Sequence, residues 1–403
     1  MAERGRISRR TLLGAAAGAT VAGVAAPAYA GSGPYRYPVV SDGDAWTRLR
    51  TFDDMARATR LPDGLAARMP TEALLASVLD HPLLMSAWAY NSVQRGIESI
   101  ASRVDVVGEL LRRPDAGPVL LKRYAAADVR IPRSATLEAA GAHVFALWKL
   151  EVLLAQPAVL RTLSPAQLEA VLRVGRDVYK VKSIESEFGM SGLEPTAMLL
   201  GRALGTVERW DWRQSKFLAG ALAATPEPIE AVAWCVDRHE REPGKAHLAG
   251  SQMTTMDHLS TVYTPRGTPV TVQIHTIELT AGEIAESKAY FTRYFPLAIQ
   301  ETEPTRKYNC HAFAWYSSSP FGNVWMNTPG DDVYWLDSSY LQWTGGTYRE
   351  NMNWSWRTDD HSGGEVGASG TLLGKWGPGP RMRHPAGHSP YKSDLIYKYY
   401  RNW

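Results

Sequence analysis

The residues most able to do chemistry in this sequence lie in the block Tyr308–Tyr316, which contains Cys310, one of only two cysteines. The apolar residues after Cys310 predict a helix that buries one face, with Cys310 in its first turn. Free amides and the positive end of the helix dipole would there stabilise a thiolate and receive an oxyanion during attack on a carbonyl. A buried structural cysteine explains the same block, because an isolated cysteine is usually buried.

A thiolate nucleophile needs a base, and histidine suits that role near neutral pH. The best candidate is His361, which follows Asp359 and Asp360 further along the chain. His384 and His388 are weaker rivals, because they lie in a tail rich in Pro and Gly, where solvated loop histidines are common.

We expect several other histidines and the second cysteine to have structural roles. His311 is next to Cys310 but would point elsewhere on the helix, and His258 and His275 have no spacing typical of metal ligands. Cys235 lies on an apolar stretch and predicts a buried core thiol. Two cysteines cannot form a Cys-rich zinc site, so we expect neither a metal nor another cofactor.

Two regions of different composition would position these residues. Residues 31–224 predict a helical domain, because from Thr51 onward the chain is rich in Ala, Leu, Arg and Glu with helical spacing. Thr71 is the expected N-cap of one helix, and Ser164–Gln167 is a capping box that begins another.

Helix-forming residues become rare further on. Residues 225–264 predict a linker or turn region, with turn-like segments at Pro226–Pro228 and Arg241–Gly244. Residues 265–403 predict a β-rich domain with one or two helices. Thr268–Ile274 alternates like a strand, and eight of the fourteen tryptophans lie at or after Trp315. The whole chain is therefore expected to be α+β.

The first thirty residues predict a twin-arginine signal peptide. Ser8–Leu13 matches the twin-arginine pattern, and Ala28–Ala30 provides a cleavage site with small residues. This segment carries four arginines and one glutamate, which account for the whole formal net charge of +3. The mature protein would be nearly neutral, so composition gives no reason to expect nucleic acid as a partner. No later apolar run is long enough to anchor the mature protein in a membrane, and we expect it to be secreted.

The block around Cys310 resembles the Asn-Cys-His-x-aromatic-Ala-Trp motif of a group of exported, mostly uncharacterised bacterial proteins. The resemblance covers most of the mature chain. It continues through Leu79–Leu83, Ala89–Ser92, Glu194–Leu199, Trp325–Asn327, Asp360–Ser362, Lys375–His384 and Ser389–Tyr391.

In architecture the C-terminal region resembles papain-like cell-wall amidases, the NlpC and CHAP groups. These enzymes place a cysteine at a helix start and a histidine on a following strand. The resemblance implies a papain-like α+β domain with Cys310 as nucleophile and His361 as general base. Backbone amides would hold the oxyanion, supported by Asn309 or Tyr308. The implied activity is that of a secreted thiol protease or amidase acting on peptidoglycan peptide or on a protein.

Two alternatives remain open at this point. Ser362–Gly367 is rich in glycine and predicts a poor strand, and Thr371–Lys375 offers no side chain that would orient the base. A catalytically inactive secreted binding protein on the same fold would explain both features. The same Cys/His pair could also perform acyl transfer, because an amine can intercept a thioester as well as water can.

Overall fold

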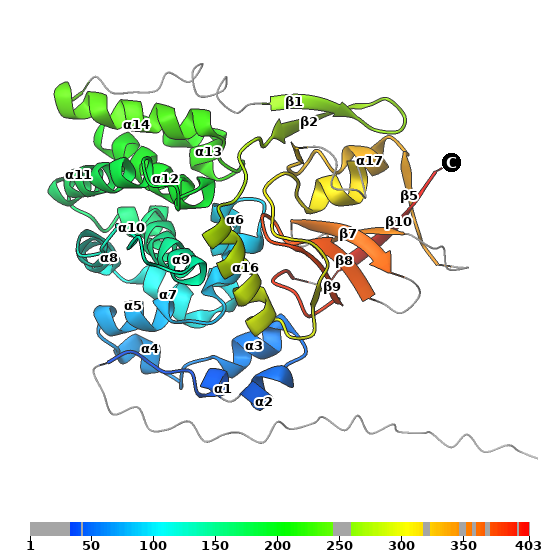
Figure 1. Cartoon of the computed structure of the whole chain (residues 1–403), viewed down its shortest axis with the longest axis horizontal. Helices are drawn as coiled ribbons and strands as arrows, with labels where there is room; N and C mark the ends of the chain where they lie inside the picture. The colour runs from blue at the N-terminus through cyan, green and yellow to red at the C-terminus, as the bar shows by residue number, and fades with distance from the viewer. Residues whose placement is uncertain are drawn as a thin grey trace, which may run out of the picture. The chain divides into compact units, whose positions relative to one another are not determined.

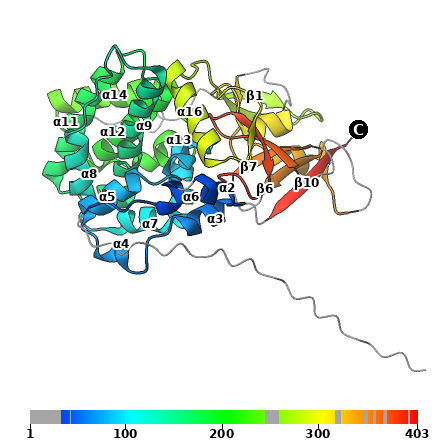
Figure 2. The same cartoon turned by 60° about the horizontal axis from the view of Figure 1, so that its bottom comes forward.

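The computed structural model describes residues 33–41, 43–244, 259–316, 323–345, 352–356, 360–366, 371–392 and 395–402. The predicted signal peptide at residues 1–30 lies outside the described residues. From Ser32 to Trp403 the chain forms one compact unit. Figures 1 and 2 show its helices gathered on one side and its strands on the other.

The described part of the N-terminal region is helical, as predicted. Its elements are α1 (Pro38–Ser41), α2 (Gly43–Thr47), α3 (Phe52–Ala58), α4 (Leu65–Arg68), α5 (Thr71–Leu79), η1 (Leu84–Ala89), α6 (Val93–Arg103), α7 (Asp105–Arg112), α8 (Ala116–Ala125), α9 (Leu137–Leu154), α10 (Pro157–Leu160), α11 (Pro165–Lys182), α12 (Met190–Val207), η2 (Trp212–Gln214), α13 (Lys216–Ala219) and α14 (Pro226–Arg241).

Local sequence signals set several of these boundaries. The capping box at the start of α11 is confirmed: the Ser164 side chain accepts from the Gln167 amide, and the Gln167 side chain accepts from the Ser164 amide. The prediction that Thr71 is an N-cap is wrong. It is the first residue of α5, and its hydroxyl donates to Asp115 Oδ1 at 2.8 Å.

The prediction of a turn at Pro226–Pro228 is wrong, because α14 begins there. A proline in the first turn of a helix loses no hydrogen bond, so the two prolines start this helix rather than prevent it. Ile229, Val232 and Cys235 are buried along one face of α14. Burial of that apolar face is the driving force for the helix.

The C-terminal region is a mixed α+β arrangement with antiparallel sheets, which confirms the predicted fold class. A three-stranded sheet has the order β1 (Leu259–Tyr263), β2 (Pro269–Ile274), β4 (Val324–Trp325). A seven-stranded sheet has the order β3 (Ile299–Gln300), β9 (Arg381–Pro385), β8 (Thr371–Lys375), β7 (His361–Val366), β6 (Asn353–Trp356), β10 (Ile396–Arg401), β5 (Tyr340–Gln342). Its helical elements are α16 (Ala281–Tyr294), the π-helical η3 (Ala312–Tyr316) and α17 (Val333–Leu336).

Helix α16 joins the two regions, and it lies between them in both views (Figures 1 and 2). It packs closely on α9 where Gly141 faces Gly282. A Cβ on Gly141 would lie 2.1 Å from the Gly282 carbonyl oxygen, so only glycine permits this approach. The β-rich region is thereby held directly against the helical region.

The two faces of the seven-stranded sheet have different surroundings. In β7, successive side chains point to opposite faces, so Ser362 and His361 point apart. Ser362 faces η3, where its hydroxyl accepts from Trp315 Nε1 at 3.0 Å. His361 faces the other side, together with its cross-strand neighbour Trp356.

The glycine-rich run after His361 forms strand β7, although its composition predicts a poor strand. Gly363 provides space for the indole of Trp354 on the neighbouring strand, because a Cβ there would lie 2.3 Å from that ring. The indole of Trp354 therefore occupies the space that a side chain at position 363 would need, which explains the glycine at that position of a central strand.

Among the residues that the structure describes, no helix has both the length and the apolar character of a membrane span.

Candidate active site

Cys310 is the first residue of a helical segment that continues into η3, as predicted. The side chain of Asn309 fixes this start. Its Oδ1 accepts from the amides of Ala312 at 3.1 Å and Met326 at 3.2 Å, and its Nδ2 donates to the Met326 carbonyl at 2.5 Å. Asn309 therefore ties the cysteine to the residue that follows β4. Its role is to position Cys310.

Tyr308 does not reach the thiol in a comparable way. Its ring belongs to the apolar cluster that includes Ala312 and Phe313, and the ammonium of Lys375 lies 5.0 Å from the ring centroid. Lys375 is itself buried and donates to the carbonyls of Thr305, Gly377 and Gly379.

Asn91, from the segment between η1 and α6, approaches Cys310 from the helical region. Its Oδ1 accepts from Asn309 Nδ2 at 3.0 Å and lies 3.5 Å from Cys310 Sγ. Its Nδ2 also lies 3.5 Å from Cys310 Sγ, and 3.2 Å from Asp360 Oδ2. The Asn91 amide, with its donor Nδ2, therefore lies against the sulfur from an element far away in the sequence.

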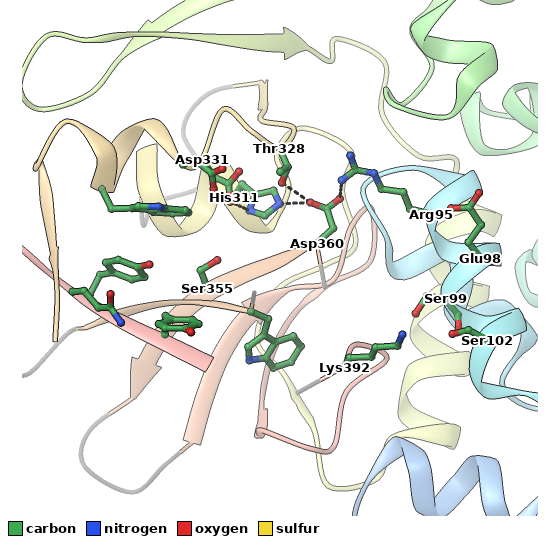
Figure 3. Close-up of a pocket in the computed structure, with 16 residues that line it drawn as sticks. Arg95, Glu98, Ser99, Ser102, His311, Thr328, Asp331, Ser355, Asp360 and Lys392 are labelled. Carbon is green, nitrogen blue, oxygen red and sulfur yellow. Dashed lines mark hydrogen bonds and ion pairs between the residues drawn. The ribbon is translucent and has the colours of Figure 1, made fainter. Parts of the chain in front are cut away.

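His311 is bound on both ring nitrogens. Its Nε2 lies 2.9 Å from Asp360 Oδ1, while its Nδ1 lies 3.1 Å from Asp331 Oδ2 and 2.9 Å from Ser362 Oγ. Asp360 in turn accepts from Thr328 Oγ1 at 2.7 Å and forms an ion pair with Arg95 at 2.5 Å (Figure 3). The imidazole thus lies between two carboxylates.

The surroundings of His311 favour its charged form. Burial by itself would lower its pKa, but the negative charges of Asp331 and Cys310, together with hydrogen bonds to Asp360 and Cys310, raise the pKa well above its usual value. Burial likewise opposes ionisation of Asp360, yet the bond and charge of His311 and the charge of Arg95 hold its pKa well below the usual range. An imidazolium therefore lies beside Cys310 at neutral pH.

The structure places His361 away from Cys310, contrary to the prediction that it is the base. It lies on the opposite sheet face, where its ring stacks on Tyr391 with centroids 3.5 Å apart. Among the described residues, neither of its ring nitrogens has a hydrogen-bond partner. Burial lowers its pKa well below the usual value, so it remains neutral. The histidine beside the cysteine is His311, which the sequence suggested was structural.

The other histidines considered in the sequence also have different surroundings from those of a base beside Cys310. His384 is buried, with Nδ1 against the Pro385 carbonyl at 2.9 Å, and His388 Nδ1 lies 3.1 Å from the Arg50 carbonyl. His275 stacks on Trp325 at 4.9 Å, and His258 lies outside the described residues. Cys235 is buried in α14, and both it and Cys310 are free thiols.

A cavity of about 830 Å³ opens beside His311, between helix α6 and the seven-stranded sheet (Figure 3). His311 and Asp360 form part of its wall. Aromatic side chains from the β-rich region cover another part, namely Trp335, Trp356, Tyr397 and Tyr399. Cys310 is 1% exposed and is not among the lining residues, so it lies behind the wall that His311 and Asp360 form.

Within the described part of the chain, no group of three or more His, Cys, Asp or Glu side chains is arranged to hold a metal ion. Comparisons of the chain with protein-family models, curated proteins and solved structures find no match. The functional conclusion therefore depends on the geometry of the site.

Proposed function

We propose that this protein is a secreted cysteine hydrolase that cleaves an amide bond, with Cys310 as nucleophile and His311 as its acid–base partner. The observation that carries this proposal is the convergence on one thiol of an imidazolium and an amide donor. A positive imidazolium stabilises the thiolate, which is the nucleophilic form of cysteine. His311 replaces the predicted His361 in this role.

The remaining residues have defined parts in the proposed reaction. Cys310 Sγ attacks the carbonyl carbon, and Asn91 Nδ2 donates to the oxygen on which negative charge develops. As the C–N bond breaks, His311 gives a proton to the leaving amine and a thioester forms. His311, now neutral, accepts a proton from the water that attacks the thioester. Collapse of this intermediate expels Cys310 Sγ as the thiolate and releases the acid, which restores the imidazolium–thiolate pair.

Asp360 is the positioning residue in this scheme. Its contacts with His311, Arg95 and Asn91 connect the base, the cavity wall and the amide donor in one network. The cavity supplies the path by which a substrate would approach. Because Cys310 lies behind the wall that His311 and Asp360 form, these side chains must move aside before a carbonyl can reach Sγ. Cell-wall peptide is the proposed substrate class, in line with the export signal and the motif resemblance.

The test is digestion of purified peptidoglycan by the mature protein, measured as newly released amino groups. We expect release by the wild type and none by Cys310→Ala. Cys235→Ala is the matched control, because it removes the other buried thiol, on α14, and should retain activity. Equal release by the wild type and Cys310→Ala would contradict the proposal.

The burial of Cys310 favours a second candidate, a binding protein that uses the same cavity without catalysis. In that case the two carboxylates hold His311 only as a structural cation. A wild-type protein that binds peptidoglycan fragments in the cavity, releases no amino groups and has an unreactive Cys310 would support this candidate.

A further inference from the structure

One corner of the cavity carries negative charge that the described residues do not neutralise. Asp331 is only 3% exposed and lines the cavity. Its Oδ2 contacts His311, but its Oδ1 is buried and has no hydrogen-bond partner among the described residues. A buried carboxylate oxygen without a donor is costly, so its presence points to a donor that arrives with a ligand.

Asp332 adds a second carboxylate at the same place. Its side chain is half-buried, also lines the cavity, and forms no hydrogen bond or ion pair within the part of the chain that the structure describes. Burial and the negative charges of Asp331 and Asp360 raise its pKa, against the opposing charge of His311. Three carboxylates, Asp331, Asp332 and Asp360, thus face two cations, His311 and Arg95, which leaves the corner with a net negative charge.

The cations that line the cavity offset only part of this charge. Arg95 is paired with Asp360 at 2.5 Å, and Lys392 lies on a loop at the far side of the cavity from Asp331 (Figure 3). His311 already contacts two carboxylates. A positive ligand group is the partner that the corner lacks.

An aromatic surface lies next to these carboxylates. Trp335 is on α17, whose N-cap is Asp332, and its ring stacks on Tyr399 with centroids 5.1 Å apart. Both rings line the cavity. An indole beside a carboxylate suits an ammonium group attached to an apolar body, because the ring attracts both parts.

We propose that Asp331, Asp332 and Trp335, here called the acidic corner, bind a primary ammonium group of the ligand. Asp331 Oδ1 and the Asp332 carboxylate accept from the ammonium, and the apolar part of the ligand packs on Trp335. That the ammonium belongs to a substrate rests on the proposed function. The binding of an ammonium at the acidic corner does not depend on that function. The ammonium could come from a peptide N-terminus or from a lysine-like side chain, which share this chemistry.

The test uses simple probes and the Cys310→Ala protein, so that no reaction is needed. Phenylalanine amide carries an α-ammonium like that of a peptide N-terminus, and 4-phenylbutylamine carries an ammonium on an alkyl chain like that of a lysine side chain. Their neutral counterparts are N-acetylphenylalanine amide and 4-phenylbutan-1-ol. Titration followed by calorimetry should show at least one amine binding about tenfold more tightly than its counterpart, the scale of one charge-assisted hydrogen bond. The amine with the larger advantage identifies the source of the group.

Asp332→Asn should remove this advantage, since it deletes a charge that forms no hydrogen bond or ion pair with the other described residues. Asp177→Asn, at an exposed position on α11, is the matched control and should preserve it. Equal binding of amines and neutral probes, or an advantage that persists in Asp332→Asn, would overturn the inference. Peptidoglycan digestion by the wild type without any amine preference would overturn this inference alone. An amine preference without digestion would support it and contradict only the proposed hydrolase activity.

Discussion

Asp360→Asn tests the network around His311. The substitution keeps the size of the side chain but removes the charge that faces His311 at 2.9 Å and Arg95 at 2.5 Å. Breaking a buried ion pair by removing one partner typically costs about 3–5 kcal/mol. The Arg95 side chain is 33% exposed, so solvent screens its ion pair with Asp360. We take the contribution of that pair to stability as at most about 1 kcal/mol. We expect a loss of about 3 kcal/mol in the free energy of unfolding at pH 5.

The loss should depend on pH in a defined way. The pKa of Asp360 is lowered by folding, so its contribution is present above the unfolded value of about 3.9 and disappears as the pH falls through the folded value. The pKa of His311 is raised, so its contribution is complete below about 6.5 and disappears as the pH rises through the folded value. Between about pH 4 and 6.5 both contributions are present, and the substitution should be most damaging there.

The assay is urea denaturation of the mature wild type and Asp360→Asn at pH 3, 5, 7 and 9. Asp177→Asn, which removes an exposed carboxylate, is the control and should change stability by less than about 0.5 kcal/mol. A difference below about 1 kcal/mol at pH 5, or one that is the same at every pH, would refute the reasoning.

Three further predictions concern separate parts of the structure. Gly141→Ala should lower the free energy of unfolding by about 1–3 kcal/mol, because the new Cβ would meet the Gly282 carbonyl. In the same denaturation assay Gly175→Ala should lower that free energy by less, because its Cβ would meet only the flexible Leu200 side chain. Asn91→Ala should lower kcat on peptidoglycan about 100-fold or more with little change in KM, and equal changes in both would contradict its role as an oxyanion donor. Burial raises the pKa of Glu283 to about 7, so its ionisation should lower the free energy of unfolding of the wild type as the pH rises from about 4.3 to 7. Glu283→Gln should remove this dependence of stability on pH. An unchanged dependence in Glu283→Gln would show that another group causes it.

Local signals predicted the features that depend on local interactions. The division into a helical region and an α+β region follows from composition and periodicity. The start of α11 at Ser164 and strand β2 follow from a capping box and from alternation. Helix α14 was missed because two prolines were interpreted as a turn, whereas both are compatible with a first helical turn.

The site could be predicted only in part. Cys310 was identified from its block, but choosing His361 required knowing which face of β7 meets the helix, and a shift of one residue reverses that face. Asp360 and Ser362, on either side of His361, are the residues that reach His311. Asn91 comes from the other region of the chain, and the only sequence signal for it was its place within the resemblance at Ala89–Ser92.

The most direct test of the central claim is the rate at which iodoacetamide labels each cysteine, mapped by mass spectrometry from pH 5 to 10. Cys235 is the internal reference, because burial raises its pKa to about 11. If His311 activates Cys310, Cys310 should be labelled near neutral pH well before Cys235, and His311→Gln should slow that labelling about tenfold or more. Labelling of Cys310 only at alkaline pH, at the same rate as Cys235, would contradict the account.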